Sequence, residues 1–71
     1  MKLPRGIPGT DVVRALEKLG FTAVRQSGSH IRLVRGSQRV TVPNHESLAP
    51  GTLKSILRQA EIDVDVFVKN L

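Results

Sequence analysis

Residues 21–43 read FTAVRQSGSHIRLVRGSQRVTVP and contain three runs in which apolar and polar side chains alternate. Two turns of glycine and serine, Ser27-Gly28-Ser29 and Gly36-Ser37, separate the runs. Alternation of period two between such turns is typical of antiparallel strands joined by hairpins. The stretch therefore predicts a three-stranded antiparallel sheet, with strands over residues 21–26, 30–35 and 38–42.

The two hairpins fix which side chains share a face of this sheet. A two-residue turn at Gly36-Ser37 sets Arg35 opposite Gln38. Counting outward brings four apolar side chains onto one face: Ile31, Leu33, Val40 and Val42. The other face receives His30, Arg32, Val34, Arg39 and Thr41. A first turn at Ser27-Gly28 adds Val24 to the core opposite Ile31 and sets Arg25 opposite His30. The outward face is therefore predicted to be basic and polar.

Helical patterns flank the sheet segment on both sides. Residues 10–19 carry apolar side chains at helical spacing, with Thr10 as the N-cap and Gly20 as a left-handed stop. A second helix begins at Pro50 and presents one apolar stripe: Leu53, Ile56, Leu57 and Ala60. Asp63 is expected to cap a short last helix over residues 64–70, which docks on the domain through Val66, Phe67 and Leu71.

The order of these elements predicts an α+β fold. Helices segregated to one face of an antiparallel sheet leave the other face open. A chain of 71 residues has room for a single domain, residues 1–71, with a small core. Such marginal cores are typical of domains that gain stability from a dimer contact or a bound partner.

The composition excludes several classes of protein. The chain has no cysteine, which rules out disulfides, cysteine-based zinc sites and thiol nucleophiles. No metal cage or cofactor motif is present in the sequence. Apolar runs are only a few residues long, and residues 1–9 lack the apolar stretch of a signal peptide. We therefore expect a cytoplasmic protein that does not contact a membrane.

The charge balance indicates the kind of partner. Eleven basic residues against six acidic ones give a net charge of +5 at pH 7. A strongly basic small domain favours a nucleic acid or an acidic protein as partner, because Lys and Arg release counterions when they neutralise phosphates. The alternative is a small protein that is merely basic and soluble.

The chemistry available near neutral pH rests on two histidines, His30 and His45, since the chain has no tyrosine or cysteine. His30 begins a strand on the outward face, among Arg25, Arg32 and Arg39. The imidazole can act as a base, and the arginines can hold a phosphate. Because RNA supplies its own nucleophile in the 2′-hydroxyl, such a site can cleave RNA without a metal. Alternatively, His30 is a solvated hairpin residue.

The remaining candidate residues also have a structural interpretation. His45 is either a second proton-transfer group or a loop residue that makes hydrogen bonds. Gly28 and Ser29 either form the turn or allow close approach of a phosphate. Lys54 and Arg58, one turn apart on the second helix, either follow the RNA backbone or form an ordinary solvated face.

Four blocks of sequence, in order, resemble the HicA family of mRNA interferase toxins, also called YcfA-like proteins. The blocks are LEKLGF at residues 16–21, VRQ with GSH within 24–30, VTVPNH at 40–45 and GTLKSILRQ at 51–59. The resemblance covers nearly the whole chain, as far as Val66-Phe67.

This resemblance implies the fold of a double-stranded-RNA-binding domain and a toxin of a type II toxin–antitoxin system. It implies that mRNA is the substrate, that a HicB-type protein is the antitoxin and that His30 is the catalytic histidine. We therefore expect a metal-independent endoribonuclease whose RNA-binding residues are Arg25, Gly28, Ser29, Arg32, Arg39, Lys54 and Arg58. The alternatives are a non-catalytic RNA-binding module of the same fold and an interaction protein that docks an acidic partner.

Overall fold

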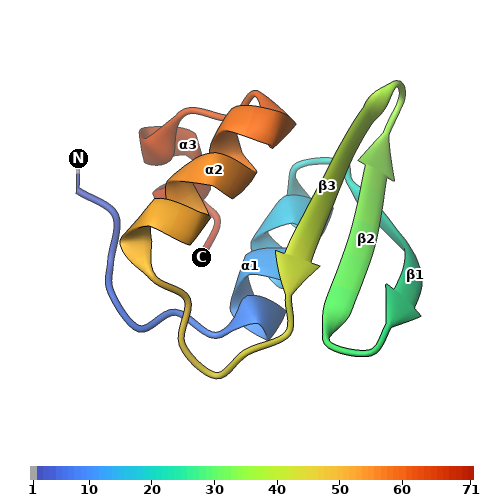
Figure 1. The fold of residues 1–71 in the computed structure, drawn as a ribbon. Coiled ribbons are helices and arrows are strands. Elements are labelled where there is room, and N and C mark those ends of the chain that lie inside the picture. Colours follow the sequence, from blue (N-terminus) through green and yellow to red (C-terminus); the bar gives the residue numbers. More distant parts are fainter. Residues whose placement is uncertain (1) are drawn as a thin grey trace.

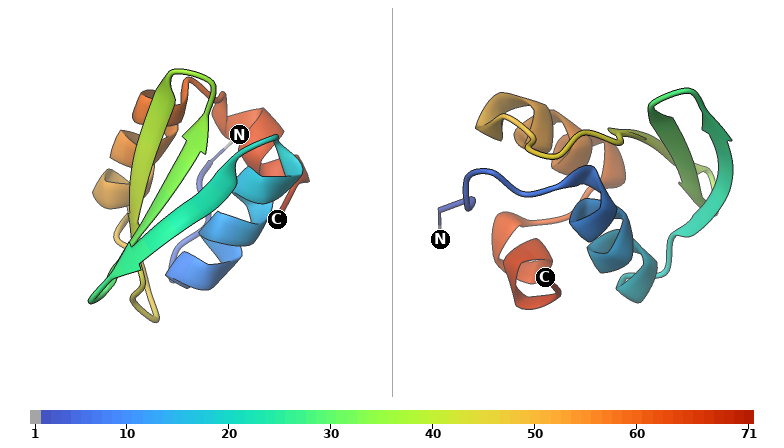
Figure 2. Two further views of the ribbon diagram at one scale, coloured as in Figure 1. Left: turned by 90° about the vertical axis from the view of Figure 1, so that its right-hand side faces the viewer. Right: turned by 90° about the horizontal axis from the view of Figure 1, so that it is seen from below.

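The computed structural model describes residues 2–71. Met1, the first residue of the segment that lacks the apolar stretch of a signal peptide, lies outside them. The elements follow the order α1 (Gly9–Lys18), β1 (Thr22–Ser27), β2 (His30–Arg35), β3 (Gln38–Pro43), α2 (Pro50–Ala60) and α3 (Val64–Lys69). The strands form one antiparallel sheet in the order β1-β2-β3, and the helices lie on one side of it (Figures 1 and 2). The expected α+β fold is confirmed.

The pairing of β2 with β3 is the one that the sequence predicts. Arg35 lies opposite Gln38, Leu33 opposite Val40, and Ile31 opposite Val42. Gly36 has φ +59°, the positive value that a two-residue hairpin needs at its first turn position. The inner face of the sheet is therefore apolar.

The pairing of β1 with β2 differs from the expectation. The hairpin turns at Gly28-Ser29, with φ +57° at Gly28, so Arg25 pairs with Arg32 rather than with His30. The register shifts between Ala23 and Arg25, which leaves Val24 in a bulge without a partner on β2. Its side chain is 52% exposed, so the prediction that Val24 joins the core is wrong. Since the partner of Arg25 moves by two residues, that side chain stays on the outward face.

The core lies between the inner face of the sheet and the three helices. It contains the predicted stripe of α2 and part of that of α1, together with side chains from β2 and β3. Its largest fully buried members are Val12, Leu16, Leu33, Val40, Val42, Leu53 and Phe67. On α3 only Phe67 is fully buried, while Val64 and Val68 pack partly against the core. Val66 and Leu71 are 41% and 45% exposed, because a six-residue helix directs one face inward and Leu71 follows its end; their predicted docking is wrong.

The helix ends follow the sequence only in part. Gly20 has φ +99° directly after the end of α1, so the predicted left-handed stop is confirmed. The N-cap of α1 is Pro8 rather than Thr10, and no side chain caps this end. Asp63 occupies the N-cap position of α3 but makes no side-chain capping bond. At α1 the Gly9 amide donates to the His45 carbonyl at 2.8 Å, so tertiary contact replaces a local cap.

Gly9 also sets how closely α1 approaches the exit of β3. It is buried, and a Cβ atom placed on it would lie 2.1 Å from the Pro43 carbonyl oxygen. A backbone bridge between Ile7 and Leu48 holds the same loop a few residues further on. The loop between β3 and α2 is therefore fixed by backbone contacts with the segment that begins α1.

We predict that Gly9→Ala lowers the free energy of unfolding by about 2 kcal/mol or more, because backbone atoms must move apart to admit the methyl group. Gly51→Ala is the matched control, since it lies in the first turn of α2 with nothing within 4 Å of the added Cβ. That variant should keep or gain stability, by up to about 1 kcal/mol. Urea denaturation measures both, and equal effects of the two substitutions would contradict the predicted clash.

Arg35 joins the far end of the sheet to both long helices. Its guanidinium donates to the Leu19 carbonyl at 2.9 Å, to the Ala60 carbonyl at 3.2 Å and to the Gln38 side chain at 2.8 Å. The same group lies over the ring of Phe21, 4.5 Å from its centroid. One cation thus donates hydrogen bonds at the C-terminal ends of both α1 and α2, where carbonyl groups lack partners within their own helices.

We predict that Arg35→Met destabilises the domain by about 2 kcal/mol, because three hydrogen bonds and the contact of the cation with the Phe21 ring are lost. Arg39→Met, on the exposed face of β3, should change stability by less than about 0.5 kcal/mol. Thermal unfolding of both variants provides the comparison. A loss confined to Arg39→Met, or none in either, would contradict this role of Arg35.

Candidate active site

The outward face of the sheet carries a shallow hollow of about 190 Å³. Figure 2 shows this face turned toward the viewer in its left view, with the helices behind it. All three strands contribute to the lining, which consists of Arg25, Ser27, His30, Arg32 and Thr41. The predicted open, basic and polar face is therefore present, and no acidic side chain lines the hollow.

His30 is placed by the hairpin between β1 and β2. It is the first residue of β2, and its backbone lies opposite Ser27 on β1 and Pro43 on β3. The Asn44 amide donates to the Ser29 carbonyl, which ties the turn to the exit of β3. The His30 side chain is exposed, and among residues 2–71 it makes no hydrogen bond. Both imidazole nitrogens are therefore free to act on a bound molecule.

Arg25 and Arg32 are cross-strand neighbours on this face. They pair directly between β1 and β2, and Arg32 pairs with Thr41 on its other side. Like charges directly opposite each other destabilise a sheet. Within the part of the chain that the structure describes, neither arginine makes an ion pair. The pair therefore costs stability in the free protein and creates a position where an anion binds favourably.

The turn residues have a different role from the hollow's lining. Gly28 and Ser29 lie beside His30 but do not line the hollow, and a Cβ on Gly28 would meet nothing within 4 Å. The positive φ of Gly28 accounts for its glycine. Ser27 and Thr41 do line the hollow, although sequence reasoning did not select them. The alternation along the strands already put Thr41 on this face, whereas Ser27 was assigned to the turn.

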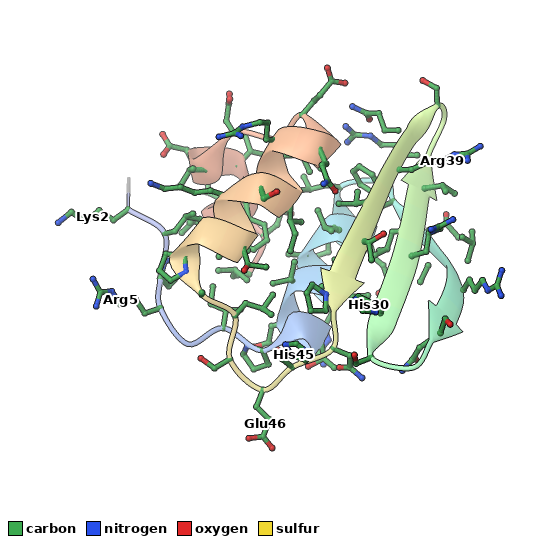
Figure 3. All side chains as sticks on the ribbon, in the orientation of Figure 1. Lys2, Arg5, His30, Arg39, His45 and Glu46 are labelled. Carbon is green, nitrogen blue, oxygen red and sulfur yellow. The ribbon has the colours of Figure 1, made fainter. Side chains whose placement is uncertain are left out.

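His45 is not brought into the hollow. It lies exposed in the loop between β3 and α2, and its carbonyl accepts the hydrogen bond from Gly9. Figure 3 shows His45 on this loop, just beyond the end of β3 and near His30 in that view, but its side chain does not line the hollow. The backbone contact supports the structural interpretation of this position, and a role in proton transfer stays a prediction.

The other predicted RNA-binding residues are spread over the molecule. Arg39 lies on the outward face, opposite Val34, toward the end of the sheet away from His30 (Figure 3). Lys54 and Arg58 are exposed on α2, which packs against the inner face of the sheet. Lys54 lines a different hollow, which it shares with residues 2–5. The structure therefore gathers only Arg25 and Arg32 of the predicted cations around His30.

We predict that Arg25→Gln keeps or raises the free energy of unfolding, by about 0.3 kcal/mol, because it removes the like-charge contact with Arg32. Arg39→Gln is the control, since its cross-strand partner Val34 is uncharged, and it should leave stability unchanged. Thermal unfolding at low salt measures the difference. A loss of more than about 1 kcal/mol in Arg25→Gln would show that this arginine supports the fold instead.

Residues 2–71 contain no group of three or more His, Cys, Asp or Glu side chains that could hold a metal ion. Over the same range, no helix combines the length and apolar character that crossing a bilayer requires.

The fold and the site define a small basic α+β domain whose open sheet face is organised around one histidine and two arginines. The family model described as "HicA toxin of bacterial toxin-antitoxin" matches residues 9–62. The chain therefore belongs to the HicA toxin family, as the sequence blocks indicated. The match runs from the start of α1 to just beyond α2 and includes every residue of the hollow. No curated protein matches the chain.

Proposed function

We propose that the chain is a metal-independent endoribonuclease that cleaves mRNA in the cytoplasm and is neutralised by a HicB-type antitoxin. The observation that carries the proposal is the hollow on the outward face, where one free histidine lies with two unpaired arginines and no acidic group. Membership in the toxin family supports the same activity. The hollow suits a phosphodiester because it offers a proton acceptor beside two positive charges.

His30 is the proposed general base. Its imidazole takes the proton from the 2′-hydroxyl, and the 2′-oxygen forms a bond with the adjacent phosphorus. The bond from phosphorus to the 5′-oxygen then breaks, which leaves a 2′,3′-cyclic phosphate and a 5′-hydroxyl. The imidazolium, or water in this exposed site, returns a proton to the leaving 5′-oxygen. Atoms and protons balance, and no external nucleophile is needed for the cleavage step.

Arg25 and Arg32 are proposed to hold the scissile phosphate. Their guanidinium groups approach the hollow from neighbouring strands and counter the negative charge that grows on the phosphate oxygens in the transition state. Ser27 and Thr41 offer hydroxyl groups that can hydrogen-bond the bound nucleotide. Arg39 extends the basic surface along β3, where it can contact a neighbouring phosphate.

The antitoxin is proposed to bind over the same face. An acidic surface of a HicB-type protein complements the unpaired arginines and relieves the repulsion between Arg25 and Arg32. A partner that binds only the folded toxin also stabilises this small domain by mass action.

We predict that His30→Ala abolishes cleavage of a labelled single-stranded RNA in EDTA, with a rate loss of at least about 100-fold. RNA binding and the circular dichroism spectrum should stay close to those of the wild type, because the exposed side chain makes no contact on which the fold depends. His45→Ala is the comparison: its side chain does not line the hollow, so cleavage should be retained, and a comparable loss would assign His45 the second proton-transfer role. The test uses purified toxin freed from antitoxin.

Three outcomes would overturn parts of this proposal. Retained cleavage by His30→Ala would remove that residue from the mechanism while leaving the nuclease activity standing. Intact RNA with the folded wild type, together with binding that weakens as salt rises, would instead identify a non-catalytic RNA-binding module. An absence of RNA binding at low salt would favour a protein that only docks an acidic partner.

A further inference from the structure

A second hollow lies where the N-terminal segment crosses the start of α2. Its volume is about 410 Å³, more than twice that of the hollow around His30. The lining consists of Lys2, Leu3, Arg5, Pro50, Lys54 and Val64. Two chain segments that are far apart in the sequence, residues 2–5 and 50–54, thus supply most of this site.

The lining combines positive charge with an apolar floor. Lys2, Arg5 and Lys54 are exposed, and within residues 2–71 none of them forms an ion pair or a side-chain hydrogen bond. Leu3 and Val64 are half-buried and pack against the core. Asp63 and Asp65 flank Val64 in the sequence but do not line the hollow. The charge of this hollow therefore stays uncompensated in the free protein.

The adjoining end of α2 leaves this charge in place. Pro50 is at the start of the helix, the first turn holds no acidic residue, and no side chain caps it. The positive end of the helix dipole therefore adds to the field of the three cations. The helix end alone would not be a site. The three cations and the apolar side chains of Leu3 and Val64 line one hollow together and make it one.

This hollow lies away from the one around His30. Figure 3 shows Lys2 and Arg5 on the opposite side of the molecule from the sheet, with His45 between Arg5 and His30 in that view. The whole domain measures 29 × 24 × 17 Å, so a molecule that reaches both hollows must be extended. Lys54, which the sequence predicts to follow the RNA backbone, lines this second hollow.

We propose that the second hollow binds a phosphodiester of the RNA substrate several nucleotides away from the scissile bond. The inference rests on the proposed function and adds a second anchoring point to it. Phosphate oxygens would contact the three cations, while the attached ribose or base lies on the floor formed by Leu3 and Val64. A nucleotide uses both parts of the lining, whereas an isolated inorganic anion uses only the rim. The RNA then passes along the loop that carries His45.

The test compares RNA length with charge removal. Binding is measured by fluorescence anisotropy in the non-cleaving His30→Ala background, with single strands of ~4 and ~16 nucleotides, which bracket known single-strand site sizes. The variant is Lys2→Gln with Arg5→Gln. Arg14→Gln with Lys18→Gln is the control, because it removes the same charges from exposed positions of α1.

The variant should weaken binding of the long strand by about tenfold and leave binding of the short strand within about twofold. The slope of log affinity against log salt for the long strand should fall by about 0.7, as expected when the contact with one single-stranded phosphate is lost. The control should change both quantities by much less. The Lys2→Gln, Arg5→Gln variant with His30 intact should show the same dependence on RNA length in its cleavage rate.

Three outcomes would overturn the proposal. If the variant weakens the binding of the short and the long strand equally, the second hollow is not a separate contact. Equal effects of the variant and the control would reduce the result to net charge. Unchanged RNA binding with weakened antitoxin binding would assign the hollow to an acidic protein segment instead. If the length dependence is found but no RNA is cleaved, the second contact stands and the nuclease proposal fails.

Discussion

The guanidinium of Arg35 bonds the C-terminal ends of two helices at once. It donates to the carbonyls of Leu19 and Ala60 while it lies over the ring of Phe21. A planar cation with donors on several edges is suited to this junction, because each helix end presents carbonyl groups and negative partial charge. Gln38 donates to the same Ala60 carbonyl and to Glu61, which has left-handed backbone at φ 56°. The hairpin end of β2 and β3 is thereby attached to the helical layer.

This attachment gives the two ends of the sheet different tasks. At the Arg35 end, positive charge is satisfied by carbonyl groups and serves the fold. At the His30 end, Arg25 and Arg32 face each other without an acidic partner, and their charge is available to a ligand. The same residue type thus stabilises one end of a short strand and lowers stability at the other. An arrangement that opposes folding is more informative about function than the net charge of the chain.

The sequence was sufficient for the features that follow from regular spacing. The two-residue turn at Gly36-Ser37 admits one register, so the pairing of β2 with β3 and the apolar inner face were predicted correctly. The bulge at Val24 was not predicted, because the adjacent apolar residues Ala23 and Val24 leave open which of them faces the core, and only the pairing with β2 reveals the extra residue. The N-terminus of α1 has no side-chain cap, and its Gly9 amide donates instead to the His45 carbonyl, which is distant in the sequence. Lys54 is exposed on α2, as expected, but spacing along a helix does not show that residues 2–5 lie beside it.

All six residues of β1 are exposed, and none belongs to the core. Its attachment to the domain therefore depends on backbone hydrogen bonds to β2, and burial contributes little. Segments of this kind occupy the low end of the local unfolding scale, and they open at free energies well below that of the whole protein. Because Arg25 and Ser27 lie on β1, the hollow around His30 is disassembled in such partially open states while the core stays intact. The population of a complete site is thus a local equilibrium, separate from the global stability of the domain.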